Sequence, residues 1–285
     1  MSNLPPRRAN REWLLALKSP WVWGVLGIFV ATTGCALPPV TPTTAEPITE
    51  TISAELPIAH HLQLGQLSIH SDRELPPSHR LLQELLKLRQ DLLAPLGLPP
   101  SEETIHVYLF ESPERFRSYS ATLAHPISHR RAYFIQTDTS LSVYAAWSDQ
   151  VATDLRHELT HAYLHSVVPR LPLWLDEGLA ENFEVAPGQM QWNAVHLKTL
   201  SKTPPISLRE LEKRHDPAAM SQHDYASSWA WVHFLLHDSE MSRAELQQQL
   251  AHWKQDSEAP RLSQLAQQKE WDLAALQSHL ASSGQ

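Results

Sequence analysis

The chain of 285 residues has one cysteine, Cys35, so it cannot form an intramolecular disulfide and must be stabilised by packing. It also lacks a long hydrophobic run. The apolar stretch Trp21–Ala31 is shorter than the roughly 20 residues that a membrane-spanning helix needs. Basic residues are outnumbered, with 23 Lys and Arg against 31 Asp and Glu, and they form no basic stripe. This balance disfavours nucleic acid as a partner.

The N-terminus has the layout of a secretory signal. Four basic residues precede the apolar stretch, and Thr32-Thr33-Gly34-Cys35 follows it. The position of Cys35 after Gly34 resembles the lipobox of bacterial lipoproteins, although Thr32 departs from the aliphatic residue usual there. In that family the cysteine is acylated and becomes the mature N-terminus. The resemblance implies that residues 1–34 are removed and that Cys35 is lipidated. An uncleaved anchor with an incidental cysteine is the alternative.

Both alternatives place the rest of the chain outside the cytoplasm, in the cell envelope, held at a membrane and facing the periplasm or the cell exterior. Removal of residues 1–34 leaves 19 basic and 30 acidic residues, a net charge of −11. Residues 35–57 are rich in Pro and Thr and indicate an extended linker. We expect one domain over 58–285, with an α/β part at 58–170 and a helical part at 171–285.

The hydrophobic periodicity predicts an α+β fold with a small mixed sheet and a mainly helical C-terminal half. An irregular strand is expected around Gly65, with further strands at 104–110, 132–136 and 141–146. Helices are expected at 77–96, from 112, and at 193–200, 207–214, 221–237, 243–254 and 262–280.

The segment His157-Glu158-Leu159-Thr160-His161 is the strongest functional signal. On a helix, residues four apart lie on one face, so His157 and His161 can bind one metal ion. Glu158 lies next to them and can act on water at that metal. Glu177 supplies the third protein ligand that a catalytic zinc site needs, which leaves the fourth position open. We therefore expect one zinc ion per chain.

This motif, followed by Trp174-Leu175-Asp176-Glu177-Gly178, resembles the gluzincin clan of zinc metallopeptidases, most closely its aminopeptidase branch and the peptidase-MA-like domains. The resemblance implies a zincin-like fold, zinc ligation by His157, His161 and Glu177, and Glu158 as general base. The spacing departs from the better-known members, because only residues 162–176 separate His161 from Glu177. An edge strand at 141–146 that lines the cleft is a further implication; an ordinary core hairpin is the alternative.

Two more residues are candidates for this site. Tyr225 is expected to stabilise the oxyanion, as a tyrosine opening a later helix does in the aminopeptidase branch, with His223 as a weaker alternative. Glu181 lies one helical turn after Glu177 and is expected to orient a zinc-bound histidine. His233 and His237 are also four apart, but no third ligand accompanies them.

The sequence therefore predicts an exported zinc peptidase that acts on peptide or protein substrates. Endopeptidase action is favoured, since no Gly-rich motif of the type that positions a free peptide N-terminus is present. A lipoprotein that retains the fold only to bind peptide is one alternative, and a zinc-sequestering lipoprotein is another. The presence of Glu158 disfavours the first, and the scatter of the 17 histidines disfavours the second.

Overall fold

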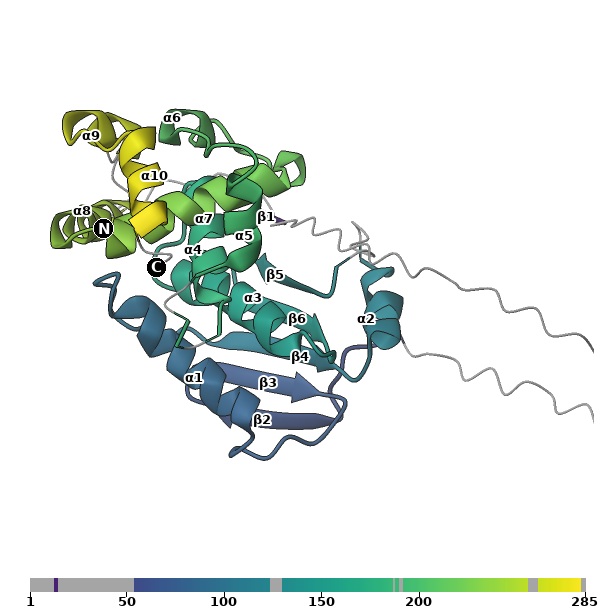
Figure 1. Cartoon of the computed structure of the whole chain (residues 1–285). Helices are drawn as coiled ribbons and strands as arrows, with labels where there is room; N and C mark the ends of the chain where they lie inside the picture. Colours follow the sequence, from purple (N-terminus) through teal and green to yellow (C-terminus); the bar gives the residue numbers. More distant parts are fainter. Residues whose placement is uncertain are drawn as a thin grey trace, which may run out of the picture.

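The computed structural model describes residues 13–14, 54–123, 130–186, 188–189, 192–255 and 261–282. They form a mixed α/β fold in which one sheet packs against a larger helical part (Figure 1). The expected mixed sheet and helical C-terminal half are therefore present. Residues 1–12 and 15–53, which include Cys35, nearly all of the linker and the expected signal apart from Trp13 and Leu14, lie outside the described residues. No helix in the described part of the chain is long and apolar enough to span a membrane.

The sheet has the order β1-β5-β6-β4-β3-β2. Strands β3, β4 and β6 are parallel to one another, whereas β2, β5 and β1 pair antiparallel with their neighbours. The bounds are β1 Trp13–Leu14, β2 His60–Leu64, β3 Leu67–Ser71, β4 Ile105–Phe110, β5 Ala132–Gln136 and β6 Leu141–Ala146.

The first predicted strand is wrong, because it is a hairpin of two strands. Gly65 has φ 58°, a left-handed conformation that glycine adopts without steric cost, and the chain reverses there. The pairing Leu64↔Leu67 and Leu62↔Ile69 keeps the apolar residues of β2 and β3 on one face. The alternation therefore looked like that of one irregular strand.

The prediction of β5 and β6 is confirmed, but β6 is not an edge strand. It lies between β4 and β5, and β5 pairs on its other side with the two residues of β1. Val143 and Ala145 are fully buried in the core. Strand β5, which runs antiparallel to β6 and contacts the helix at 151–165, therefore lies nearer the edge of the sheet than β6.

One face of the sheet is covered by α1 (Arg80–Leu93) and α3 (Val151–His165), which also pack on each other (Figure 1). Leucines of α1, such as Leu82, Leu85 and Leu92, are at most 1% exposed. The short helix α2 (Pro113–Ser120) lies against β4 and β6, and Ser112 caps its N-terminus as predicted. Buried helix α3 is thus fixed between the sheet and the helical part.

The helical part is centred on α7 (Gln222–His237), which packs against α4 (Leu173–Phe183), α5 (Ala194–Leu200), α8 and α10. The other bounds are α6 Leu208–Leu211, α8 Glu240–Lys254, α9 Leu262–Gln268 and α10 Leu273–Ser282. The single helix predicted over 262–280 is wrong. The chain turns at Glu270, where φ is 58°, and this interrupts the helix.

The closest approach of α4 and α7 occurs at Gly178. A Cβ atom there would lie 2.6 Å from the carbonyl oxygen of Ser228, which is too close for any side chain. Asn182, one turn later, donates from its amide to the carbonyls of Gly178 at 2.6 Å and Trp229 at 3.0 Å. These contacts fix the helix that carries Glu177 directly against α7.

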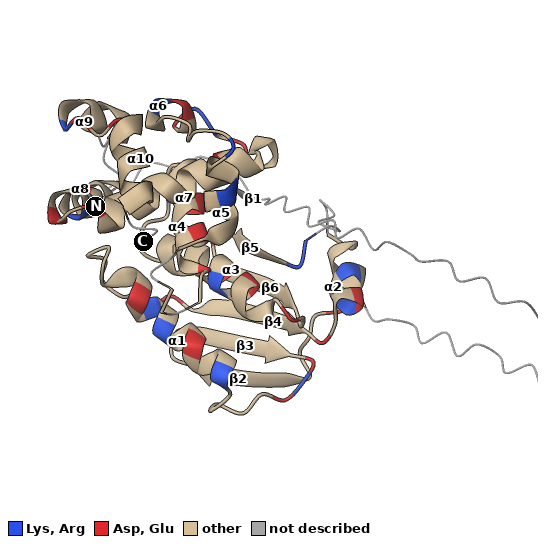
Figure 2. Ribbon diagram, viewed as in Figure 1, with Lys and Arg blue, Asp and Glu red and all other residues tan. Residues whose placement is uncertain are grey.

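Charged residues are spread over the helices, and the sheet strands carry almost none (Figure 2). Both signs follow each other along α1, where Lys87 and Asp91 form an exposed pair at 2.5 Å. Exposed pairs of this kind stabilise little. The charges with structural consequences lie inside, on α3 and α4.

Candidate metal centre

Helix α3 places His157 and His161 one turn apart, as the spacing predicts. They are 6% and 0% exposed, respectively. Leu155, Leu159 and Ala162 bury the same helix in the core, which fixes the backbone that carries both imidazoles. Arg156, between these positions, is held by the carboxylate of Glu84 and by the carbonyl of Glu184 at 2.6 Å. The helix is therefore fixed at both its apolar and its polar side.

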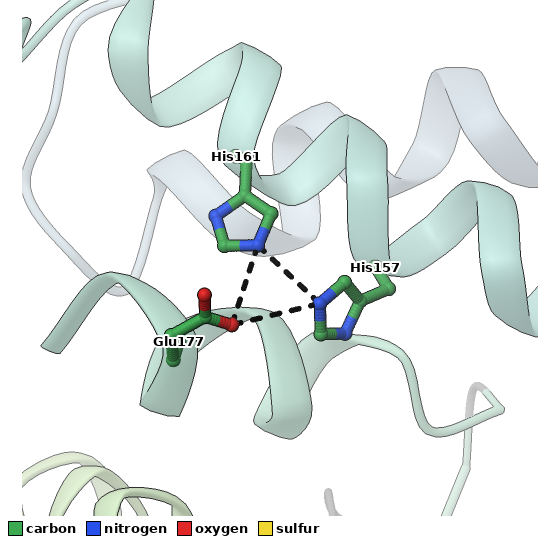
Figure 3. Close-up of side chains that lie close together, drawn as sticks. All are labelled: His157, His161 and Glu177. Atoms are coloured by element: carbon green, nitrogen blue, oxygen red, sulfur yellow. Dashed lines mark hydrogen bonds and ion pairs between the residues drawn. The ribbon is translucent and has the colours of Figure 1, made fainter. Parts of the chain in front are cut away.

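Helix α4 brings Glu177 to the two histidines (Figure 3). Its Oε2 lies 3.8 Å from His157 Nε2 and 3.7 Å from His161 Nε2, and the two Nε2 atoms are 3.3 Å apart. Tetrahedral zinc with bonds of about 2.0–2.1 Å separates its ligand atoms by about 3.3 Å. The three atoms therefore lie at nearly the separations that one zinc ion requires.

Among the described residues, the carboxylate of Glu177 has no hydrogen-bond partner for either oxygen, although it is fully buried. Leaving a buried carboxylate unpaired is strongly unfavourable. Burial accordingly raises the pKa of Glu177 well above its usual range, although the charge of His157 opposes the shift. A cation between Glu177 and the two histidines would satisfy these oxygens. The described residues thus contain a buried group that could hold a metal ion.

Both histidines donate from Nδ1 to a carboxylate, which leaves Nε2 directed at the shared centre. His161 Nδ1 lies 3.0 Å from Asp176 Oδ1, and His157 Nδ1 lies 3.0 Å from Glu184 Oε2. A hydrogen bond of this kind fixes the tautomer and the ring orientation of a metal ligand. Neither Asp176 nor Glu184 was singled out in the sequence. Glu184 could have been found, because it lies seven residues, about two helical turns, after Glu177.

The hydrogen bond to a histidine of this cluster that was expected of Glu181 is made instead by Asp176 and Glu184. Its Oε2 accepts a hydrogen bond of 2.6 Å from His196 Nε2 on α5, and no bond joins it to either predicted ligand. Burial raises the pKa of Glu181, but the charge and hydrogen bond of His196 outweigh it and lower the pKa to about 2. Glu181 remains close enough to contribute to the negative potential at His157. It binds α5 to α4 and acts on the centre through its charge.

The carboxylates around His157 favour its protonated form. Burial lowers its pKa, but the hydrogen bond to Glu184 and the charges of Glu158, Glu184 and Glu181 raise it to about 10. As an imidazolium, His157 can donate from Nδ1 to Glu184 and from Nε2 to His161, which lies 3.3 Å away. Metal binding would replace this proton, because a ligand histidine needs the Nε2 lone pair.

Glu158 and Tyr225 also lie at this centre. Glu158 is 5% exposed, and its charge acts on His157, Glu177 and Tyr225. The hydroxyl of Tyr225 is buried without a hydrogen-bond partner among the described residues. Burial raises the pKa of this hydroxyl, and the charge of Glu177 raises it further. A protonated hydroxyl beside the three ligand atoms is a suitable donor for a developing negative charge.

Arg130 is a residue of this centre that the sequence did not reveal. It directly precedes β5, and its charge interacts with those of Glu158, Tyr225 and Glu177. Burial lowers the pKa of its guanidinium, and the nearby glutamates oppose this shift. Arg130 therefore adds one positive charge to a centre that otherwise contains mostly carboxylates.

The other histidines of interest do not join this cluster. His223 Nε2 donates to the carbonyl of Pro204 at 2.8 Å. His233 Nδ1 lies 2.9 Å from His279 Nε2, and these two do not appear in any group of three possible metal ligands among the described residues. His125 and His129 lie outside the described residues.

No protein-family model matches the chain, and no curated protein matches it either. The site is therefore interpreted from its own geometry.

Proposed function

We propose that this chain is a zinc-dependent peptidase of the gluzincin type, with one zinc ion held by His157, His161 and Glu177. The convergence of two Nε2 atoms and one carboxylate oxygen within 3.8 Å of one another carries this proposal. Two imidazoles and a carboxylate are a donor set of catalytic zinc sites, which keep one position open. The unpaired oxygens of buried Glu177 support the same conclusion.

Zinc bound there would polarise the scissile carbonyl and lower the pKa of a water molecule to near neutrality. Glu158 would accept a proton from a water molecule in the centre and would return it to the leaving amine. Tyr225 donates its hydroxyl to the oxygen that becomes negative. His157 and His161 are kept in the metal-binding tautomer by Glu184 and Asp176. The substrate is a peptide or protein, and the signal-like N-terminus supports an exported, membrane-held location.

The test is the pair of wild-type protein and Glu158→Gln. Glutamine keeps the size of the side chain and leaves the three ligands in place but cannot accept a proton. We expect equal zinc content by elemental analysis and a loss of peptide hydrolysis by several orders of magnitude in a peptide-library digest. A chelator should abolish the wild-type activity, and added zinc should restore it.

Glu114→Gln is the matched control, because Glu114 is exposed on α2 and far along the chain from the motif. Its hydrolysis rate should equal that of the wild type. Hydrolysis by Glu158→Gln at the wild-type rate would refute the role of the base. Zinc binding without cleavage by either form would make the chain a zinc-containing binding module.

A further inference from the structure

A second carboxylate, Asp176, joins two histidines beside the metal centre. Its Oδ1 lies 3.0 Å from His161 Nδ1, and its Oδ2 lies 3.0 Å from His165 Nε2. His165 Nδ1 in turn lies 2.7 Å from Oε1 of Gln136, the last residue of β5. Asp176 is 2% exposed, and His161 and His165 are 0% and 8% exposed. A continuous hydrogen-bonded chain therefore runs from a predicted metal ligand to the sheet.

In this series of hydrogen bonds, the group that donates in one bond fixes which atom can donate in the next. An ionised carboxylate can only accept, so His161 must donate from Nδ1 and His165 from Nε2. His161 then keeps its Nε2 lone pair, which points at His157 and Glu177. At Nδ1, His165 either donates to Oε1 of Gln136 or, as a neutral ring that already donates from Nε2, accepts from the NH2 of Gln136 with the amide in its other orientation. Each member thus constrains the next.

We propose that Asp176 is the positioning residue of His161 and that His165 and Gln136 hold it in place. The inference rests on the proposed function for its chemistry, since it assigns His161 as a ligand of that zinc. Asp176 itself does not touch the reacting atoms. It sets the ring plane and tautomer of His161, and through His165 it ties the metal helix α3 to the end of strand β5.

The geometry also predicts how strongly each of these residues affects the affinity for zinc. Asp176 contacts His161 directly, His165 acts through Asp176, and Gln136 acts through His165. Loss of a residue that orients a metal ligand commonly lowers metal affinity 10–100-fold. The dissociation constant for zinc should therefore rise most for a change at Asp176, less for His165→Leu, and least for Gln136→Leu.

The experiment uses the full-length chain with Asp176→Asn, His165→Leu and the control Asp72→Asn. Asp72 is also a mostly buried carboxylate, paired with Arg115 at 3.1 Å and unconnected to the metal centre by any hydrogen bond described. Zinc dissociation constants are measured by chelator competition. The protonated ring nitrogen of each histidine is identified by NMR with ¹⁵N-labelled histidine.

Asparagine offers one oxygen where aspartate offers two, so it can serve only one imidazole. We expect Asp176→Asn to raise the zinc dissociation constant about 10–100-fold and to switch His165 from the Nε2–H to the Nδ1–H tautomer. Asp72→Asn should change neither. A merely structural role of Asp176 would lower the melting temperature without moving a tautomer.

Asp176→Asn with a zinc dissociation constant within about twofold of the wild type and unchanged tautomers would overturn the inference. If that variant does not fold, His165→Leu becomes the test. An unchanged zinc dissociation constant in His165→Leu would then refute the proposed series of hydrogen bonds. A third result would also overturn the inference. If Glu177→Gln retains zinc and His165→Leu loses it completely, the ion is bound by His161, His165 and Asp176 instead. A wild-type chain that binds no zinc would refute the proposed function, whereas the tautomers of the metal-free protein would still test the hydrogen bonds.

Discussion

Each histidine of the candidate centre uses its two ring nitrogens for different purposes. The Nδ1 atoms of His157 and His161 donate to Glu184 and Asp176, and their Nε2 atoms face Glu177. The functional unit is therefore a pair of carboxylate-bound imidazoles rather than the sequence motif alone. Changes to one side chain should separate metal binding from catalysis.

His157→Ala should lose nearly all zinc, because it removes one of the three proposed ligand atoms from around the fully buried Glu177. Elemental analysis of the purified variant checks this. His233→Ala is the matched control, since His233 is also a buried helical histidine but lies outside the ligand cluster. Undiminished zinc in His157→Ala would refute the site assignment.

Tyr225→Phe should lower kcat far more than it raises KM, because a donor to the oxyanion acts mainly in the transition state. The expected loss is about 3–4 kcal/mol of transition-state stabilisation. Its stability should not fall, since the hydroxyl has no hydrogen-bond partner to lose. Steady-state kinetics and thermal melting measure the two effects.

Tyr163→Phe is the control, because it should lower stability without changing kcat. Its hydroxyl donates to the carbonyl of Leu85 at 3.2 Å and lies on the side of α3 that faces α1. Loss of that bond should lower the free energy of unfolding by about 1 kcal/mol and leave kcat unchanged. An unchanged kcat in Tyr225→Phe would transfer the oxyanion role to another donor, and Arg130, whose charge interacts with that of Tyr225, would be the next candidate.

At the scale of elements, the position of Glu177 depends on how closely α4 approaches α7. Gly178→Ala would bring a Cβ atom to 2.6 Å from the backbone oxygen of Ser228, and backbone cannot move aside as a flexible side chain can. We expect a loss of about 1–3 kcal/mol in the free energy of unfolding. Zinc affinity should fall as well, because the adjacent Glu177 moves with the helix.

Gly97→Ala separates these two effects. Gly97 has φ 64°, so alanine there is strained and should cost about 1 kcal/mol or more, but the position lies beyond the end of α1 and an added Cβ would meet Gln247 of α8. Denaturant unfolding and chelator competition on both variants are the measurements. Equal zinc affinity in Gly178→Ala and wild type would show that α4 can shift without moving the ligand.

Local patterns were enough to predict most elements, and they named three residues, His157, His161 and Glu177, that lie together in the structure. The alternation of 132–136 and 141–146 gave both strands with their bounds, and Ser221 marked the start of α7. The hairpin at Gly65 was missed because the apolar alternation continues through the turn. Glu181 was assigned by helical spacing alone, and this spacing could not reveal that His196, on another helix, binds it. Partners contributed by distant segments require the tertiary structure.

At the scale of the whole molecule, the N-terminal region should separate the fold from a membrane. Apart from the two residues of β1, the described fold begins at residue 54, after the Pro- and Thr-rich segment 35–57 has nearly ended. A single lipid chain anchors only weakly, so stable attachment requires the several chains of a bacterial lipoprotein. We predict that Cys35 is the lipidated first residue of the mature protein. Mass spectrometry of the mature N-terminus tests this, and Cys35→Ser should prevent lipidation and release the protein from membranes.

An intact Met1 with unmodified Cys35 would replace the lipoprotein with a simple N-terminal anchor. That result would leave the metal centre unaffected, because no residue of the cluster belongs to the first 57 residues. Location and chemistry are thus independent properties of this chain.

The proposed ligand set predicts which metal ions inhibit the protein. Two imidazole nitrogens and one carboxylate oxygen bind Cu²⁺ more tightly than Zn²⁺. Along the divalent metals of the first transition row, the affinity of such sites increases up to copper and is lower for zinc. Copper prefers tetragonal geometry, whereas the three atoms here suit a tetrahedron. Copper should therefore displace zinc and inhibit hydrolysis, and excess zinc after copper removal should restore it. A protein held outside the cytoplasm would depend on the relative supply of these two ions in its surroundings.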